Sequence, residues 1–150
     1  MTLENILRQQ LSNPEPGGFH VQAGGWNITV AAEKKDSLSC ALNALTLEKA
    51  EPIAEDVRAW ATRIAERATG LMEPLRLIEA DVKQGKAILR SDSPAKRDGK
   101  ALYYELLLNR TDRSSATLRR YAGQPGEPRE TMPFVLTHDA IVKLANDIVG

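Results

Sequence analysis

Residues 19–30 read FHVQAGGWNITV, two runs of alternating apolar and polar residues separated by Gly24 and Gly25. Alternation with a period of two is typical of a strand that buries one face. Two glycines supply the positive φ angles that a two-residue hairpin turn requires. Such a turn places three apolar pairs on one face: Ala23 with Trp26, Val21 with Ile28, and Phe19 with Val30. We therefore expect an antiparallel hairpin with one side in the core.

A third strand is expected beyond the charged residues 33–36, because apolar and polar residues alternate again after them. If these charged residues form the turn, three further pairs share the apolar face: Val30 with Leu38, Ile28 with Cys40, and Trp26 with Leu42. The pattern predicts a three-stranded meander in which Cys40 is buried in the middle of the sheet.

Three amphipathic helices are expected around the strands. The first covers residues 3–11 after an N-cap at Thr2, and its apolar stripe comprises Leu3, Ile6, Leu7 and Leu11. The second begins at Pro52 and ends at a C-cap on Gly70, and its inner stripe comprises Ile53, Val57, Trp60, Ile64 and Ala68. The third follows an N-cap at Thr137, and its inner face comprises Ile141, Leu144, Ala145 and Ile148.

Two further hairpins are expected after the second helix. Residues 75–82 pair with 87–90 about Gln84-Gly85, and residues 102–109 pair with 116–122 about the turn 111–113. A short strand follows at residues 134–136. The predicted order is α-β-β-β-α-β-β-β-β-β-α, which lacks the βαβ alternation of a parallel sheet. We therefore expect one α+β domain over residues 1–150, an antiparallel sheet with the three helices on one face.

The composition is that of an ordinary globular protein. The 150 residues include 20 basic and 20 acidic side chains, so a whole-molecule attraction to nucleic acid or to an anionic membrane is not expected. Cys40 is the single cysteine, which excludes an intrachain disulfide and fits a reducing compartment. Residues 1–16 show no signal-peptide pattern, and no apolar run has the roughly 20 residues that span a bilayer. We expect a cytoplasmic protein.

Few residues are candidates for catalysis or metal binding. His20 is expected on the polar face of a strand, His138 in the first turn of a helix, and Cys40 in the core. The glycine pairs at 17–18 and 24–25 lack the following helix and the Lys-Ser/Thr pair of a phosphate-binding loop. We therefore predict no catalytic residue, no metal site and no cofactor, which argues against an enzyme.

Basic side chains concentrate in residues 96–129, which contain eight basic and four acidic residues. Tyr103 and Tyr121 are expected side by side on the outer face of their hairpin, next to the pair Glu105 and Arg119. Aromatic rings beside cations on an open sheet can stack on bases and neutralise phosphates, although the same residues suit a solvated sheet face. The candidate binding surface comprises Lys96, Arg97, Tyr103, Arg110, Arg113, Arg119, Arg120 and Tyr121.

The order of elements resembles the type III secretion chaperone-like fold. The resemblance rests on the helix of Leu3, Ile6, Leu7 and Leu11, on the meander of residues 26–42 and on the helix of residues 53–68, and it covers most of the chain. It implies a homodimer that binds segments of partner proteins along apolar grooves.

Three functions from different classes remain open. The first is a non-enzymatic, chaperone- or adaptor-like protein-binding module, whose partner is another protein or a second copy in a homo-oligomer. The second is a nucleic-acid-binding module that uses the basic region 96–129. The third is a small-ligand protein or an enzyme whose site is assembled from scattered residues. No membrane partner is expected.

Overall fold

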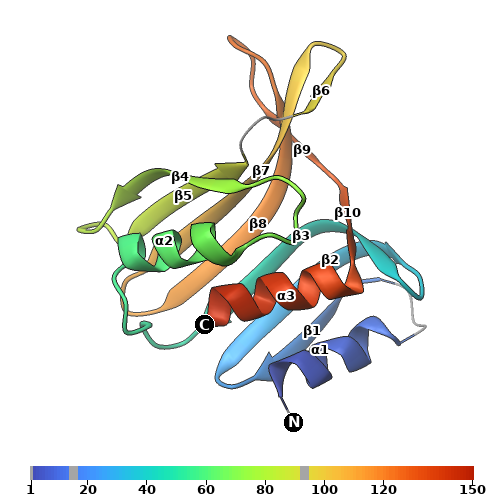
Figure 1. Cartoon of the computed structure of the whole chain (residues 1–150), viewed down its shortest axis with the longest axis vertical. Helices are drawn as coiled ribbons and strands as arrows, with labels where there is room; N and C mark the ends of the chain where they lie inside the picture. The colour runs from blue at the N-terminus through green and yellow to red at the C-terminus, as the bar shows by residue number, and fades with distance from the viewer. Residues whose placement is uncertain (1, 14–16, 92–94) are drawn as a thin grey trace.

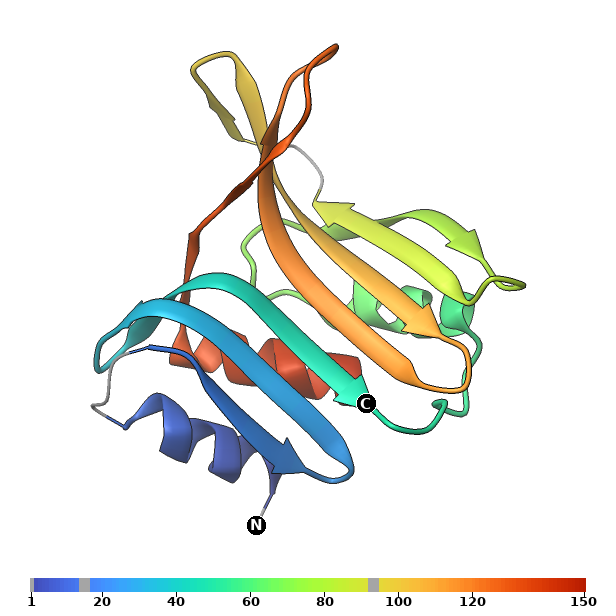
Figure 2. The ribbon, with the colours of Figure 1, turned by 180° about the vertical axis from the view of Figure 1, so that it is seen from behind.

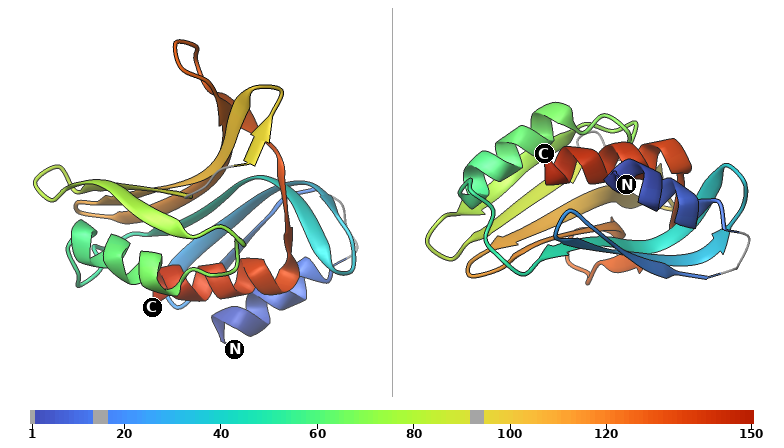
Figure 3. Two further views of the ribbon diagram at one scale, coloured as in Figure 1. Left: turned by 45° about the horizontal axis from the view of Figure 1, so that its top comes forward. Right: turned by 90° about the horizontal axis from the view of Figure 1, so that it is seen from below.

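In the computed structural model, residues 2–13, 17–91 and 95–150 are described, and residues 95–97 by their backbone alone. They form an α+β fold of three helices and one antiparallel sheet, and the predicted order of the longer elements is confirmed. All three helices lie against one face of the sheet (Figures 1 and 3), and the described residues place no helix on the other. We call this second face the helix-free face.

The helices are α1 (Leu3–Leu11), α2 (Val57–Arg67) and α3 (His138–Val149). The strands are β1 (Phe19–Ala23), β2 (Trp26–Lys35), β3 (Ser39–Lys49), β4 (Leu75–Asp81), β5 (Lys86–Ser91), β6 (Ala95–Arg97), β7 (Lys100–Arg110), β8 (Ser114–Gly123), β9 (Glu130–Met132) and β10 (Phe134–Thr137). The short strands β6 and β9 were not among the expected elements. The strand order is β1-β2-β3-β8-β7-β5-β4, with β10 also paired to β3, β6 to β7 and β9 to β8.

The first hairpin has the predicted turn and register. Gly24 and Gly25 have φ angles of 59° and 85°, which side chains other than glycine rarely adopt. Val21 pairs with Ile28, and the other two predicted pairs also form. Local alternation and turn chemistry therefore fix this part of the sheet.

The predicted turn at residues 33–36 is wrong. β2 continues to Lys35, and the turn begins at Asp36, whose Oδ1 accepts hydrogen bonds from the N–H groups of Leu38 and Ser39, both at 2.8 Å. The register that followed from that turn is therefore also wrong, and the observed pairs are Trp26 with Lys49, Ile28 with Leu47, and Val30 with Leu45. Cys40 is nevertheless buried in the sheet, as predicted.

Helix α2 is shorter than predicted at both ends. It begins after Asp56, whose side chain accepts a 2.8 Å hydrogen bond from the N–H of Ala59, and its C-cap is Ala68 where Gly70 was expected. Pro52 precedes the helix, in a segment where the N–H of Ile53 donates to the hydroxyl of Ser114 on β8 at 2.9 Å. The whole predicted inner stripe is buried: Ile53, Val57, Trp60, Ile64 and Ala68.

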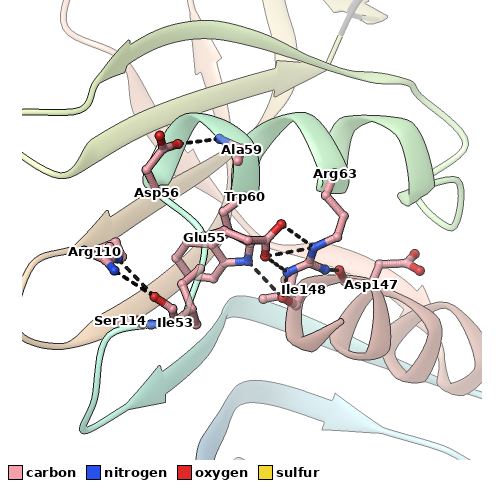
Figure 4. A network of polar contacts seen from close by, with 10 residues as sticks. All are labelled: Ile53, Glu55, Asp56, Ala59, Trp60, Arg63, Arg110, Ser114, Asp147 and Ile148. Carbon is pink, nitrogen blue, oxygen red and sulfur yellow. Dashed lines mark hydrogen bonds and ion pairs between the residues drawn. The ribbon is translucent and has the colours of Figure 1, made fainter.

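A polar network joins α2 to the end of α3 (Figure 4). Trp60 is fully buried, and its Nε1 donates to the carbonyl of Ile148 at 2.9 Å. Arg63 binds the carboxylate of Glu55 at 2.9 Å and donates to the carbonyl of Asp147 at 2.6 Å. The last carbonyls of a helix carry partial negative charge, so a guanidinium group at this end of α3 is favourable.

The sheet divides along one edge of β3. β8 pairs with residues 45–49 of β3, whereas β10 pairs with residues 39–42. Beyond this division the ends of β7 and β8 continue with β6 and β9 into an arm that projects past the helices (Figures 1 and 2). The registers predicted for the β7–β8 hairpin are confirmed, including Leu106 with Leu118 in the core. One hydrophobic core lies between the helices and the sheet.

Candidate binding surfaces

Part of the predicted binding surface is assembled on the helix-free face, which Figure 2 shows from the front. Tyr103 and Tyr121 pair across β7 and β8 as predicted, with ring centroids 5.9 Å apart. Arg119 pairs with Glu105 in the same register, two residues along the strands. With two further arginines these residues form what we call the arginine–tyrosine patch: Arg90, Tyr103, Glu105, Arg119, Tyr121 and Arg129.

Glu105 is the centre of this patch. Its side chain is 7% exposed, and its carboxylate accepts hydrogen bonds from Nε of Arg90 and from both terminal nitrogens of Arg129, each at 2.9 Å. Burial by itself raises the pKa of Glu105, but the hydrogen bonds from Arg129 and Arg90 bring the pKa below its ordinary value. The same bonds raise the pKa of Arg129. Both ions therefore stay charged.

Guanidinium groups cover the two tyrosine rings. Arg129 lies 3.8 Å from the ring centroid of Tyr121, and its NH1 donates to the hydroxyl of Tyr103 at 3.3 Å. Arg90 lies 5.5 Å from the ring centroid of Tyr103. Such cation–π contacts contribute roughly 0.5–1 kcal/mol each at exposed sites. The tyrosines and arginines thus hold one another in place.

Arg119 does not bind Glu105, although the two residues are cross-strand partners. Within the described part of the chain, its side chain has no hydrogen bond or ion pair, because Arg90 and Arg129 occupy the carboxylate. Arg76 of β4 is paired with Arg90 and so shares the same face. Three arginines of the patch, Arg90, Arg119 and Arg129, therefore accompany the one carboxylate of Glu105.

Arg120 lies on the other side of the sheet, away from the patch. Successive side chains of a strand point to opposite faces, so Arg119 and Arg120 are separated. Arg120 forms a 3.2 Å ion pair with Glu73, and its guanidinium lies 4.3 Å from the ring centroid of Tyr104. Its side chain is 14% exposed, which makes it a packing residue of the inner face.

The remaining predicted residues are also not in the patch. Arg110 and Arg113 lie at the opposite end of the β7–β8 hairpin, roughly 20 Å from the tyrosines at about 3.3 Å per residue. Arg110 donates to the carbonyl of Ile53 at 2.9 and 3.2 Å (Figure 4), and Arg113 is exposed in the turn. The side chains of Lys96 and Arg97 lie outside the described residues.

A second surface surrounds β10. A hollow of about 490 Å³ lies between this strand, the segment after α2 and the first turns of α3, and it is lined by Thr69, Gly70, Leu71, Met72, Tyr104, Val135, Leu136, Thr137, Asp139, Ala140 and Lys143. Met72 is 96% exposed and Val135 is 64% exposed. Met72 also has a φ of 61°, a conformation that costs roughly 1 kcal/mol or more for a residue other than glycine. Two apolar side chains thus stand in solvent at the rim.

The backbone of β10 presents an unpaired edge to this hollow. The N–H of His138 donates to the carbonyl of Leu38 at 2.8 Å, which makes this pair a hydrogen-bonded one of the β3–β10 ladder. Antiparallel pairs alternate, so the N–H groups of Val135 and Thr137 point away from β3. Among the described strands only β3 pairs with β10. The donors of Val135 and Thr137 therefore face the hollow.

The residues considered for metal or nucleophilic chemistry stay apart. His20 lies on the helix-free face, 3.3 Å from the hydroxyl of Thr29, and His138 begins α3. Burial raises the pKa of the Cys40 thiol. Within residues 2–13, 17–91 and 95–150, no group of three or more His, Cys, Asp or Glu side chains is arranged to hold a metal ion. No helix in these ranges has the length and apolar character to cross a membrane.

Sequence reasoning missed Arg90 and the edge of β10. Arg90 reaches Glu105 because β5 pairs with β7, and these strands are not joined by a hairpin. The edge of β10 depends on the pairing of β10 with β3. Phe134 and its partner Leu42 are 92 positions apart in the sequence, so no local pattern predicts this pairing, which follows from tertiary packing. The position of Arg120, in contrast, can be predicted from the sequence, because strand alternation puts Arg119 and Arg120 on opposite faces of the sheet.

The comparisons with known proteins add no relative to this description. No family model, no curated protein and no solved structure matches the chain.

Proposed function

We propose that this protein is a non-enzymatic, chaperone- or adaptor-like binding module that holds an extended segment of a partner protein. The observation that supports the proposal best is the unpaired edge of β10 beside the apolar hollow. A peptide that adds to a sheet edge gains affinity from main-chain hydrogen bonds and specificity from pockets for its alternate side chains. Both features are present at β10.

The edge of β10 is short and follows Pro133, but it has no charged side chain that would prevent pairing with another chain. Proteins place charges, prolines or bulges on such strands to prevent pairing with other chains. The outer strand β4 has Arg76, Glu79 and Asp81 and a register irregularity after Leu77, whereas the outer strand β1 has no Lys, Arg, Asp or Glu. The sequence of β10, FVLT, has no charge and no proline. An uncharged edge beside exposed apolar side chains is typical of a binding surface.

The hollow also indicates which segment would bind. Leu71, Tyr104 and Leu136 line it, so a side chain that points inward from the added strand should be apolar. The next side chain would point outward, beside the exposed Val135. We therefore expect a segment of about four extended residues, matching the length of β10, with an apolar residue at alternate positions and no proline opposite Val135.

The resemblance to the type III secretion chaperone-like fold supports the same proposal, because such chaperones bind partner segments. It would also imply a homodimer, so a second copy of the chain is the competing occupant of the β10 edge.

The test is a selection of short random peptides on the purified protein, followed by fluorescence anisotropy with the selected sequences. Val135→Pro removes the N–H that faces the hollow and leaves the hydrogen bonds to β3 in place. It should weaken binding at least about tenfold, the effect of losing one main-chain hydrogen bond. Val135→Thr keeps the N–H and the branched shape, so its binding should stay within about threefold of the wild type.

Two results would count against the proposal. If no peptide is selected, or if Val135→Pro binds selected peptides as tightly as Val135→Thr, the β10 edge does not hold a partner segment. If sedimentation shows that the purified protein self-associates and that Val135→Pro abolishes this association, the edge belongs to a homodimer instead.

A further inference from the structure

The arginine–tyrosine patch has a property that the β10 edge does not share, an unbalanced local charge. Among the described residues of the patch, Arg90, Arg119 and Arg129 accompany one carboxylate, that of Glu105, which binds Arg90 and Arg129 but not Arg119. The molecule as a whole is neutral, with 20 basic and 20 acidic side chains. A concentration of positive charge on one face of a neutral protein attracts an anionic partner to that face.

We propose that the patch is a second binding surface and that it binds an acidic segment of a partner protein. The inference does not depend on the proposed role of β10, because it rests on different residues and on the other face of the sheet. The patch combines three observations: guanidinium donors without an acceptor, a fixed orientation of the Arg90 donors, and tyrosine rings that already have a guanidinium group over one face.

The donors come from Arg90 and Arg119. Arg90 binds Glu105 through Nε alone, so both of its terminal nitrogens are left for an external acceptor. Its side chain is 41% exposed. Arg119, on the other side of Glu105, forms no hydrogen bond or ion pair to any described residue. A guanidinium group presents paired N–H donors that match the two oxygens of a carboxylate.

The orientation of the Arg90 donors is fixed before a partner binds. Glu105 is almost fully buried, and its carboxylate accepts a hydrogen bond from Nε of Arg90. The centroid of the Tyr103 ring lies 5.5 Å from the same guanidinium. A side chain that is already ordered loses less conformational entropy on binding. The buried carboxylate therefore positions Arg90 and Arg129 as well as neutralising part of their charge.

The covered rings favour an acidic polypeptide over a nucleic acid. Nucleic-acid-binding sheets stack bases on exposed aromatic faces. Here the guanidinium of Arg129 lies 3.8 Å from the ring centroid of Tyr121, and the rings of Tyr103 and Tyr121 pack against each other with centroids 5.9 Å apart. Carboxylates on a flexible segment can reach the donors of Arg90 and Arg119 individually.

The experiment is fluorescence anisotropy with a short labelled oligoglutamate peptide as the probe, and with an oligoglutamine peptide and single-stranded DNA for comparison. Arg119→Gln should weaken the binding of oligoglutamate by about tenfold at low ionic strength. Arg113→Gln is the matched control, because it removes the same charge from the exposed turn at the far end of the hairpin. It should change the affinity by less than about twofold.

Equal losses in the two variants would show that oligoglutamate responds to net charge alone and would overturn the proposal. An absence of oligoglutamate binding at low salt would also overturn the proposal. Circular dichroism checks that each variant is folded. Tighter binding of single-stranded DNA, reduced by Tyr103→Leu, would assign the patch to nucleic acid and overturn it as well.

Discussion

At the scale of single residues, Glu105 shows how one buried carboxylate organises a surface. Three hydrogen bonds from Arg90 and Arg129 compensate for its burial, and two tyrosines pack on the same arginines. Hydrogen bonds to charged groups contribute about 1.5–3 kcal/mol when they satisfy a buried ion. Part of the stability of the arm therefore depends on the ionisation of a single residue.

The pKa of Glu105 predicts how this stability varies with pH. The pKa is lowered in the folded state, so the ionised group stabilises the protein above its unfolded pKa of about 4.3. This stabilisation is lost as the pH falls through the lower folded-state pKa. Glu105→Gln should lower the free energy of unfolding by about 2 kcal/mol at neutral pH and flatten its decline below about pH 4.

Thermal unfolding between neutral and acid pH, monitored by circular dichroism, measures this effect. Glu66→Gln is the control, because Glu66 lies on an exposed face of α2. An acid decline that is equally steep in wild type and Glu105→Gln would contradict the role given to Glu105.

At the scale of elements, the register of a hairpin follows from local sequence, whereas the pairing between strands of different hairpins does not. Gly24-Gly25 and the alternation around it fix the β1–β2 register, and the β7–β8 register follows in the same way. The prediction of the β2–β3 turn at residues 33–36 is wrong because a run of charged residues does not define a turn; the Asp36 side chain places the turn at residues 36–38. The insertion of β10 beside β3 has no local signal.

Gly85 connects two of these elements and gives an element-scale prediction. It has a φ of 67°, and a Cβ at this position would lie 2.1 Å from the carbonyl oxygen of Arg110 in β7. Gly85→Ala should lower the free energy of unfolding by about 3 kcal/mol, from backbone strain and the steric clash together. Gly99 has a φ of 79° with open space around it, so Gly99→Ala should cost only about 1 kcal/mol.

Urea denaturation of the two glycine variants separates these contributions. Equal losses would mean that the close approach of the β4–β5 turn to β7 does not contribute, and that positive φ accounts for the whole effect in both turns.

At the scale of the whole molecule, the helix layer and the sheet could be predicted because each helix has one apolar face and the strands alternate. The candidate site could be predicted only in part. Tyr103, Tyr121 and Arg119 follow from one hairpin register. Arg90 and Arg129 do not, because they reach Glu105 from another strand and from the loop after β8. Surfaces built from several elements depend on tertiary packing, which local pattern does not encode.

We propose different binding roles for the two surfaces. The β10 edge would hold an extended partner segment through its main chain, and the arginine–tyrosine patch would attract an acidic one on the helix-free face. The first claim is the central one, because the unpaired donors of Val135 and Thr137 are its physical basis.

Amide hydrogen exchange, measured by NMR with and without a saturating selected peptide, tests this claim most directly. The N–H groups of Val135 and Thr137 should exchange at least about tenfold more slowly in the complex, because each becomes the donor of a hydrogen bond to the added strand. The N–H of Val82, in the distant β4–β5 turn, should be unaffected. A peptide that binds while Val135 and Thr137 exchange at their free rates would contradict the account.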